Sequence, residues 1–183
     1  MVLVAVMMAL LAGACSAPEY RTFEFEHSTR PSSAYETPVI TRFSFEYRSE
    51  YRKVMTYAKD NRAAPLEVRF ALATGAFGCV RPADTVFGVN IDWPDRDWRD
   101  AKEAVDRTIA GLVSPELVRE RSSITVAGIP AELLVCDTAM PERAVFFDYE
   151  GRIWNIFVYS QSSQADQAKL DFEHVVASFR LSD

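Results

Sequence analysis

The chain has 183 residues, of which 49% are hydrophobic and 25% are charged. This length and composition are ordinary for a globular protein with one hydrophobic core, and exclude a largely disordered chain. The chain carries 26 acidic and 20 basic residues, so its net charge is −6 at pH 7. A negative charge of this size disfavours binding to nucleic acid and to anionic lipid headgroups.

The first 14 residues contain no charged side chain and end in three small residues, Ala12 to Ala14, directly before Cys15. The apolar run is shorter than the ~20 residues of a membrane-spanning helix and is typical of a signal peptide. The segment resembles the lipobox of bacterial lipoproteins, which implies cleavage before Cys15 and attachment of lipid to its thiol. The protein would then be extracytoplasmic and anchored to a membrane. A secretory signal cut after Ala14 or Ala17 is the alternative, and it would leave no anchor.

Residues 15–38 are rich in Ser, Thr, Pro and charged residues, which predicts a flexible tether between the anchor and the folded domain. The apolar alternation at Tyr20, Phe23 and Phe25 leaves open a strand that docks on the domain. The expected organisation is therefore a signal peptide over 1–14, a lipid-anchored tether over 15–38 and a single domain over 39–183.

Three segments in the first half of this domain alternate apolar and polar residues, at 42–48, 66–72 and 85–91. A period of two is typical of half-buried strands. From Trp98 to Leu112 the apolar residues recur at intervals of three and four, which predicts an amphipathic helix.

Four further strands are expected at 123–127, 131–137, 143–149 and 152–160, with a tight hairpin at Glu150-Gly151. Residues 165–179 predict a second helix that faces the core. The order of strands, helix, hairpins and helix lacks an alternating βαβ pattern. It therefore predicts an α+β fold, an antiparallel sheet that carries two main amphipathic helices.

Three features of the second half resemble one family. They are the turn Val126-Ala127-Gly128-Ile129-Pro130-Ala131, the hairpin around Gly151, and the closing helix that ends in Ala177-Ser178-Phe179. Together they are similar to the PsbP/Mog1-like family, which includes bacterial lipoproteins. The resemblance covers about a third of the chain and implies the architecture, but no functional residue. It also implies a role in binding other proteins or in assembling membrane complexes, by analogy of fold.

Two cysteines remain once Cys15 is assigned to the lipid. Because the expected compartment is oxidising, a disulfide between Cys79 and Cys136 is one interpretation. Both cysteines lie beside apolar, strand-like runs, so two buried free thiols are the other interpretation.

Asp92, Asp95 and Asp97 form the densest acidic cluster, and carboxylates at this spacing could hold calcium. The segment lacks the glycine and the distal glutamate of an EF-hand loop. Capping of the helix that is expected to begin near Trp98, by Asp95 or Asp97, is the simpler interpretation. The sequence predicts neither a metal site nor a cofactor.

Basic residues alternate with Tyr47 and Tyr51 between positions 46 and 53, as in a platform that stacks nucleic-acid bases. Glutamates dilute this charge, so a solvated strand end is the preferred interpretation and no nucleic-acid partner is expected. Lys102 and Asp106 are four residues apart on the first helix and predict a surface ion pair.

No catalytic arrangement is evident in the sequence. The only histidines, His27 and His174, lie in the expected tether and on the second helix, so neither cysteine of the domain has an obvious base beside it. The serines of Ser160–Gln164 also lack one. We therefore expect a protein that is not an enzyme.

Aromatic residues offer a binding alternative. Trp154 shares a strand face with Ile156 and Val158 and is expected in the core, whereas Trp93 and Trp98 are candidates for the edge of a ligand pocket. The leading hypothesis is a membrane-anchored lipoprotein of the cell envelope whose domain binds a protein partner or helps to assemble a complex. The alternative is a lipoprotein that binds a small ligand between sheet and helix.

Overall fold

The structure is a computed structural model, and it describes residues 18–28, 40–57, 66–72, 85–92, 98–112, 114–138 and 142–182. The predictions for the signal peptide and for Cys15, Cys79 and Trp93 lie outside these residues.

The described chain is an α+β fold in which every strand pairing is antiparallel, as the sequence predicts. Its elements, in chain order, are β1 (Tyr20–Ser28), β2 (Ile40–Arg48), β3 (Arg52–Tyr57), β4 (Leu66–Leu72), β5 (Thr85–Asp92), α2 (Ala101–Ala110), η1 (Pro115–Leu117), β6 (Val118–Val126), β7 (Ile129–Cys136), β8 (Glu142–Tyr149), β9 (Arg152–Ser160), η2 (Ser162–Gln164), α3 (Ala165–Ser178) and β10 (Arg180–Leu181).

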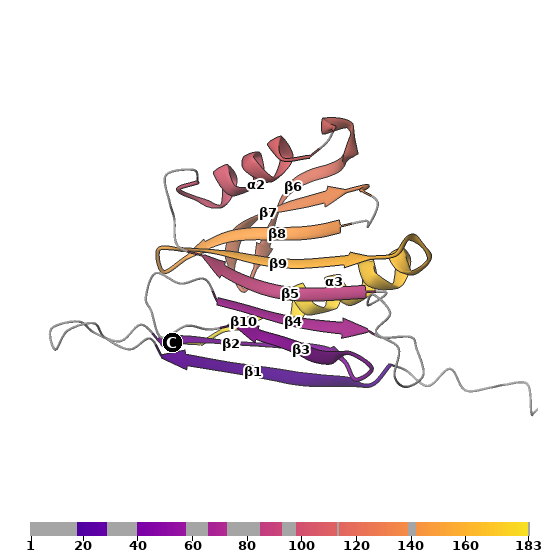
Figure 1. Cartoon of the computed structure of the whole chain (residues 1–183). Coiled ribbons are helices and arrows are strands. Elements are labelled where there is room, and N and C mark those ends of the chain that lie inside the picture. Colours follow the sequence, from indigo (N-terminus) through magenta and orange to yellow (C-terminus); the bar gives the residue numbers. More distant parts are fainter. Residues whose placement is uncertain are drawn as a thin grey trace, which may run out of the picture.

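The strands form two sheets. The larger sheet has the order β3-β4-β5-β9-β8-β7-β6, and the smaller one has the order β1-β2-β10. Helix α2 lies at the β6–β7 end of the molecule and β1 lies at the opposite end (Figure 1). Helix α3 packs against β2 and β9 and so joins the two sheets.

The larger sheet is covered on both faces, which is why seven of the nine residues of β9 are buried. Trp154 and Ile156 face the small sheet and α3, where they join the principal core. Ile153 and Phe157 point to the opposite face and pack with Ala104 and other residues of α2. The prediction that Trp154 is a core residue is confirmed, because its side chain is fully buried.

Two tight hairpins order the second half of the sheet. Val126 pairs with Ile129, and Tyr149 pairs with Arg152, so each turn contains two residues. All four turn residues have positive φ, at Ala127-Gly128 and at Glu150-Gly151. This conformation matches the right-handed twist of paired strands. The hairpin at Glu150-Gly151 is confirmed.

The expected tether contains a strand. Residues Tyr20–Ser28 form β1 and pair with β2 along its whole length. The flexible tether over 15–38 is therefore wrong for this part, and the docked strand that the alternation left open is observed. The physical reason is aromatic packing, since the rings of Phe23 and Phe70 lie 5.0 Å apart. The folded domain consequently begins near Tyr20 instead of residue 39.

The N-cap of α2 also differs from the expectation. Asp100 caps the helix, because its Oδ1 accepts a hydrogen bond of 2.8 Å from the backbone N–H of Glu103. The helix accordingly begins at Ala101 and not near Trp98. Asp95 and Asp97 lie outside the described residues.

Candidate functional site

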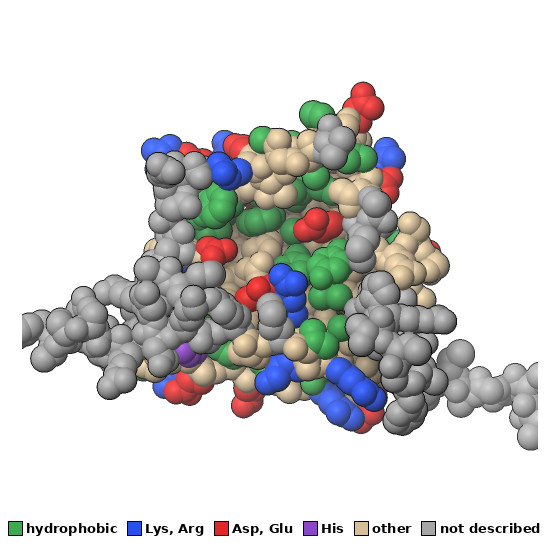
Figure 2. Space-filling view, in the orientation of Figure 1, with side chains coloured by type: hydrophobic (Ala, Val, Ile, Leu, Met, Phe, Trp, Pro, Cys, Tyr) green, Lys and Arg blue, Asp and Glu red, His purple; other side chains and the backbone are tan. Residues whose placement is uncertain are grey.

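A cavity of about 340 Å³ lies between α2 and the larger sheet. Figure 2 shows the sheet face below α2 as hollowed, with hydrophobic and acidic side chains exposed in the hollow. The cavity is lined from three strands and the helix, by Asn90, Asp92, Trp98, Ala104, Arg107, Thr108, Glu142, Phe146, Ile153 and Asn155. An apolar cavity with a few polar groups is the usual form of a small-ligand site.

The roof of the cavity is fixed at the start of α2. The backbone N–H of Ala101 donates to the carboxylate of Asp148 on β8, at 3.0 Å from Oδ1. Carboxylates stabilise the positive end of a helix, so Asp148 and the cap Asp100 both act on the first turn. The first turn is thereby tied to the strand that supplies Phe146 to the cavity.

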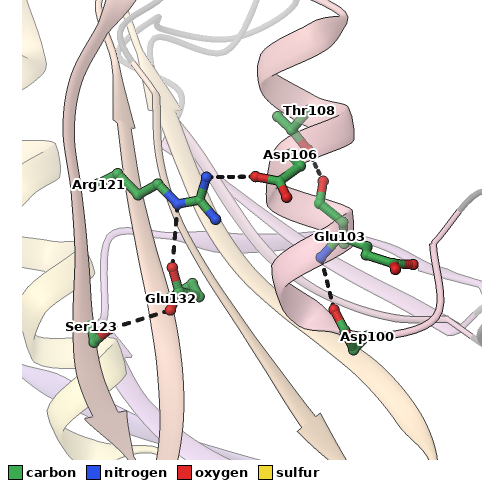
Figure 3. Close-up of polar contacts among 8 residues, drawn as sticks. Asp100, Glu103, Asp106, Thr108, Arg121, Ser123 and Glu132 are labelled. Carbon is green, nitrogen blue, oxygen red and sulfur yellow. Dashed lines mark hydrogen bonds and ion pairs between the residues drawn. The ribbon is translucent and has the colours of Figure 1, made fainter.

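A second connection holds the middle of α2 on the sheet (Figure 3). The guanidinium of Arg121 on β6 donates to Asp106 on α2 at 2.5 Å and to Glu132 on β7 at 3.3 Å. These hydrogen bonds raise the pKa of Arg121, and the bond to Asp106 has the larger effect. Ser123 adds a hydrogen bond to Glu132 at 3.2 Å. The expected pair of Lys102 with Asp106 is thus replaced by one that links helix to sheet.

The floor of the cavity carries an unsatisfied acceptor. Oδ1 of Asn90 on β5 is buried and has no hydrogen-bond partner within the described ranges. Its neighbour on β9, Asn155, donates to the carbonyl of Val145 at 3.4 Å. A buried acceptor without a partner costs about 1–3 kcal/mol, so a donor from a bound molecule would be favourable at Asn90.

Glu142 is the second unusual polar group of the cavity. Burial raises the pKa of its carboxyl, because the ionised form is poorly solvated there. An acidic group with a raised pKa that also lines a cavity is a common property of functional sites. At the cavity edge, the guanidinium of Arg107 lies over the ring of Trp98, with 5.3 Å between Cζ and the ring centroid.

Trp98 lines this cavity, Trp93 lies outside the described residues, and a ligand pocket at the two tryptophans stays a prediction. Sequence reasoning missed Asn90 and Glu142. Asn90 is a polar residue within an otherwise apolar run, and this break was the only available signal. Glu142 gave no signal, because its environment comes from strands distant in the sequence.

Cys136 is buried at the end of β7. Burial, and to a lesser extent the charge of Glu142, raises the pKa of this thiol, which lowers its reactivity. Since Cys79 lies outside the described residues, the disulfide between the two stays a prediction.

The tyrosine and arginine residues near position 50 are structural. Tyr51 is buried, and its hydroxyl donates to Asp171 on α3 at 2.8 Å. Arg48 donates to Glu50 at 2.7 Å and lies 3.6 Å from the same aspartate. These contacts join the turn between β2 and β3 to α3, which argues against a base-stacking platform at these two side chains.

Within the described ranges, no group of three or more His, Cys, Asp or Glu side chains is arranged to hold a metal ion. No helix in the same residues is long and apolar enough to cross a membrane.

Comparison with known proteins supports the fold. No protein-family model matches the sequence, and a search of curated proteins also gives no match. Among solved structures, the chain is similar to the solution structure of cyanobacterial PsbP (CyanoP) from Synechocystis sp. PCC 6803, with a TM-score of 0.53 and 12% identity. The likeness covers 93% of this chain and 97% of that one. At this identity it shows a shared architecture, and the chain accordingly has a PsbP-like α+β fold.

Proposed function

We propose that this protein is a non-catalytic, PsbP-type binding domain held at a membrane of the cell envelope by lipid on Cys15, where it binds a protein partner or assists assembly of a complex. The observation that carries the proposal is the PsbP-like fold, which extends over nearly the whole chain. The resemblance of Ala12–Cys15 to a lipobox supports the anchor. The second candidate function is that of an anchored lipoprotein that binds a small ligand, and the cavity under α2 favours it.

Few residues separate Cys15 from the folded domain, and this limits how far the domain could lie from the membrane surface. Glu19 is already held, because its carbonyl accepts a hydrogen bond of 2.8 Å from the N–H of Ser49. Four residues span at most about 14 Å, so a lipid on Cys15 would keep the start of β1 close to the headgroups. Helix α2 lies at the other end of the molecule from this anchored strand (Figure 1).

The anchor is tested by expressing the full chain in a bacterial host and separating membranes from soluble protein. We expect the unmodified chain in the membrane fraction with the mass of a diacylglycerol adduct on Cys15, and Cys15→Ala in the soluble fraction. Cys79→Ala is the matched control, since it removes a thiol but keeps the lipobox. An unmodified mass with cleavage after Ala14 or Ala17 would contradict the anchor and support the ordinary secretory signal.

The binding role is tested by chemical cross-linking in intact membranes of the native host. Because anchoring raises the effective concentration of the domain near a membrane complex, one reproducible cross-linked partner should be recovered with the wild type and strongly reduced with Cys15→Ala. A cross-linking pattern with no enriched protein would contradict the role in complex assembly.

A further inference from the structure

We propose that the cavity beneath α2 binds a linear amine of the polyamine class, with positively charged, hydrogen-bond-donating groups at both ends. This inference goes beyond the proposed function and does not depend on the lipid anchor.

The two ends of the cavity both present acceptors. At one end, the buried Oδ1 of Asn90 has no partner within the described residues, and Asp92 follows two positions later on the same strand. At the other end lies the partly buried carboxyl of Glu142. An ammonium group carries only donors, so it can satisfy an amide oxygen and a carboxylate together, which an anion or an ether cannot do.

The register of the sheet sets the separation of these ends. Asn90 pairs with Asn155 on β9, whereas Glu142 pairs with Tyr159 on the same strand. Four residues along a strand extend about 13 Å. The side chains of Asn90 and Glu142 can lean toward each other and shorten this distance, but one compact ammonium ion cannot contact both of them. The ligand must therefore be elongated, with donors at its two ends.

The remaining lining suits a methylene chain. Phe146 and Ile153 rise from the sheet, Ala104 faces them from α2, and Trp98 borders the cavity. These apolar surfaces gain from contact with an alkyl chain between the two charged ends of a ligand.

The charges of the cavity favour a cation. Asp92 and Glu142 are the acidic groups that line it, and Arg107 is the basic one. The guanidinium of Arg107 already lies over the ring of Trp98. Two carboxyl groups against one guanidinium attract an amine and repel a dicarboxylate, the ligand of opposite charge and similar length.

The test is isothermal titration of the purified full-length protein with spermidine at about 0.15 M salt, where attraction to distant surface charges is largely screened. We expect saturable binding of one spermidine for each chain. Glu142→Gln should weaken it about 10- to 100-fold, since this change removes one charge-assisted hydrogen bond. The matched control is Glu173→Gln, which removes the same charge from an exposed position on α3 and should change the affinity less than twofold. n-Butylamine, with one ammonium group, should bind much more weakly than spermidine.

Three results would overturn the proposal. One is the absence of heat and of any change in tryptophan fluorescence at millimolar spermidine. Another is equal weakening by Glu142→Gln and Glu173→Gln, which would indicate attraction to the overall negative charge. The third is that sebacate, a dicarboxylate as long as spermidine, binds more tightly than spermidine, which would assign the cavity to anions through Arg107. Thr108→Phe supplies a second, uncharged variant that fills the cavity from α2 and should abolish binding.

Discussion

Glu142 is a residue whose burial makes the stability of the fold depend on pH. Burial raises the pKa of this carboxyl above its value in the unfolded chain. The folded protein therefore binds more protons than the unfolded one in the range between the two pKa values. The contribution of Glu142 is most favourable below the unfolded pKa, near 4.3, and is lost as the pH rises through the folded pKa.

This pH dependence of stability leads to a prediction for Glu142→Gln. Glutamine has the same shape but no charge, so the variant should be more stable than the wild type at pH 7 and should lose this advantage near pH 4. Urea unfolding followed by circular dichroism at a series of pH values measures the difference. A lower stability of the variant at pH 7 would show that the carboxylate has a favourable partner in the fold. Glu173→Gln should shift the unfolding midpoint little at either pH.

At the scale of elements, the position of α2 depends on polar contacts at its start as well as on burial. Only Ala101, Ala104 and Val105 are buried on this helix, so its apolar contact with the sheet is narrow. Asp148 satisfies the N–H of Ala101 and interacts with the helix dipole. Arg121 makes the second link, through Asp106.

We therefore expect Asp148→Ala to destabilise the protein by about 1 kcal/mol, the usual net contribution of one hydrogen bond, here the one that Asp148 accepts from the N–H of Ala101. The loss of stability should be confined to α2 and the sheet face beneath it, because the principal core between the two sheets and α3 contains no residue of α2. Native-state hydrogen exchange should show faster exchange at the amides of Ala101–Ala110 than in the wild type, with α3 unchanged. Glu116→Ala, at an exposed carboxylate outside α2, is the control and should leave exchange in the helix unaltered. Uniform acceleration across α2 and α3 would contradict a local role.

For the whole molecule, the main consequence of the structure is that the N-terminal strand belongs to the domain. β1 covers one end of the principal core, and Phe23 packs on Phe45 and Phe70, with ring centroids 5.3 and 5.0 Å away. Tyr20 stacks on His174 of α3 at 3.8 Å. These contacts tie the start of the folded chain to its last helix.

Phe23→Ala tests this arrangement. Because Phe23 is only partly buried, we expect a loss of about 2 kcal/mol, below the 3–5 kcal/mol of a fully buried phenylalanine. Glu24→Ala, the next residue on the exposed side of β1, should change the free energy of unfolding by less than about 0.5 kcal/mol. The measurement is the midpoint and slope of urea unfolding. An unchanged midpoint for Phe23→Ala would support the flexible tether instead of the docked strand.

The periodic segments of the fold were predictable from the sequence. Strand β4 has the expected bounds, and α3 differs from its prediction by one residue at its end. β1 was only an alternative, because its polar residues resemble those of a tether and its pairing with β2 cannot be seen in its own sequence. β3 was missed for a related reason, since the side chains of Arg52, Lys53 and Val54 are exposed and give no clear period.

The candidate site was less accessible to sequence reasoning than the fold. Trp98 was a candidate because a large aromatic residue beside a helix start is visible in the sequence. Glu142 lines the cavity together with residues of α2, a helix more than 30 residues earlier in the chain. The ion pair of Arg121 with Asp106 likewise replaces a pair that local spacing favoured.

The sequence by itself determined the α+β class, the extents of most strands and helices, and the hairpin at Glu150-Gly151. These depend on local periodicity and on backbone conformations that few residues adopt. Only the tertiary structure decided that β1 joins the domain, that α2 covers a cavity, and that Asn90 and Glu142 line this cavity. The physical reason is that burial and the loss of a hydrogen-bond partner result from contacts between segments far apart in the chain, which no local pattern records.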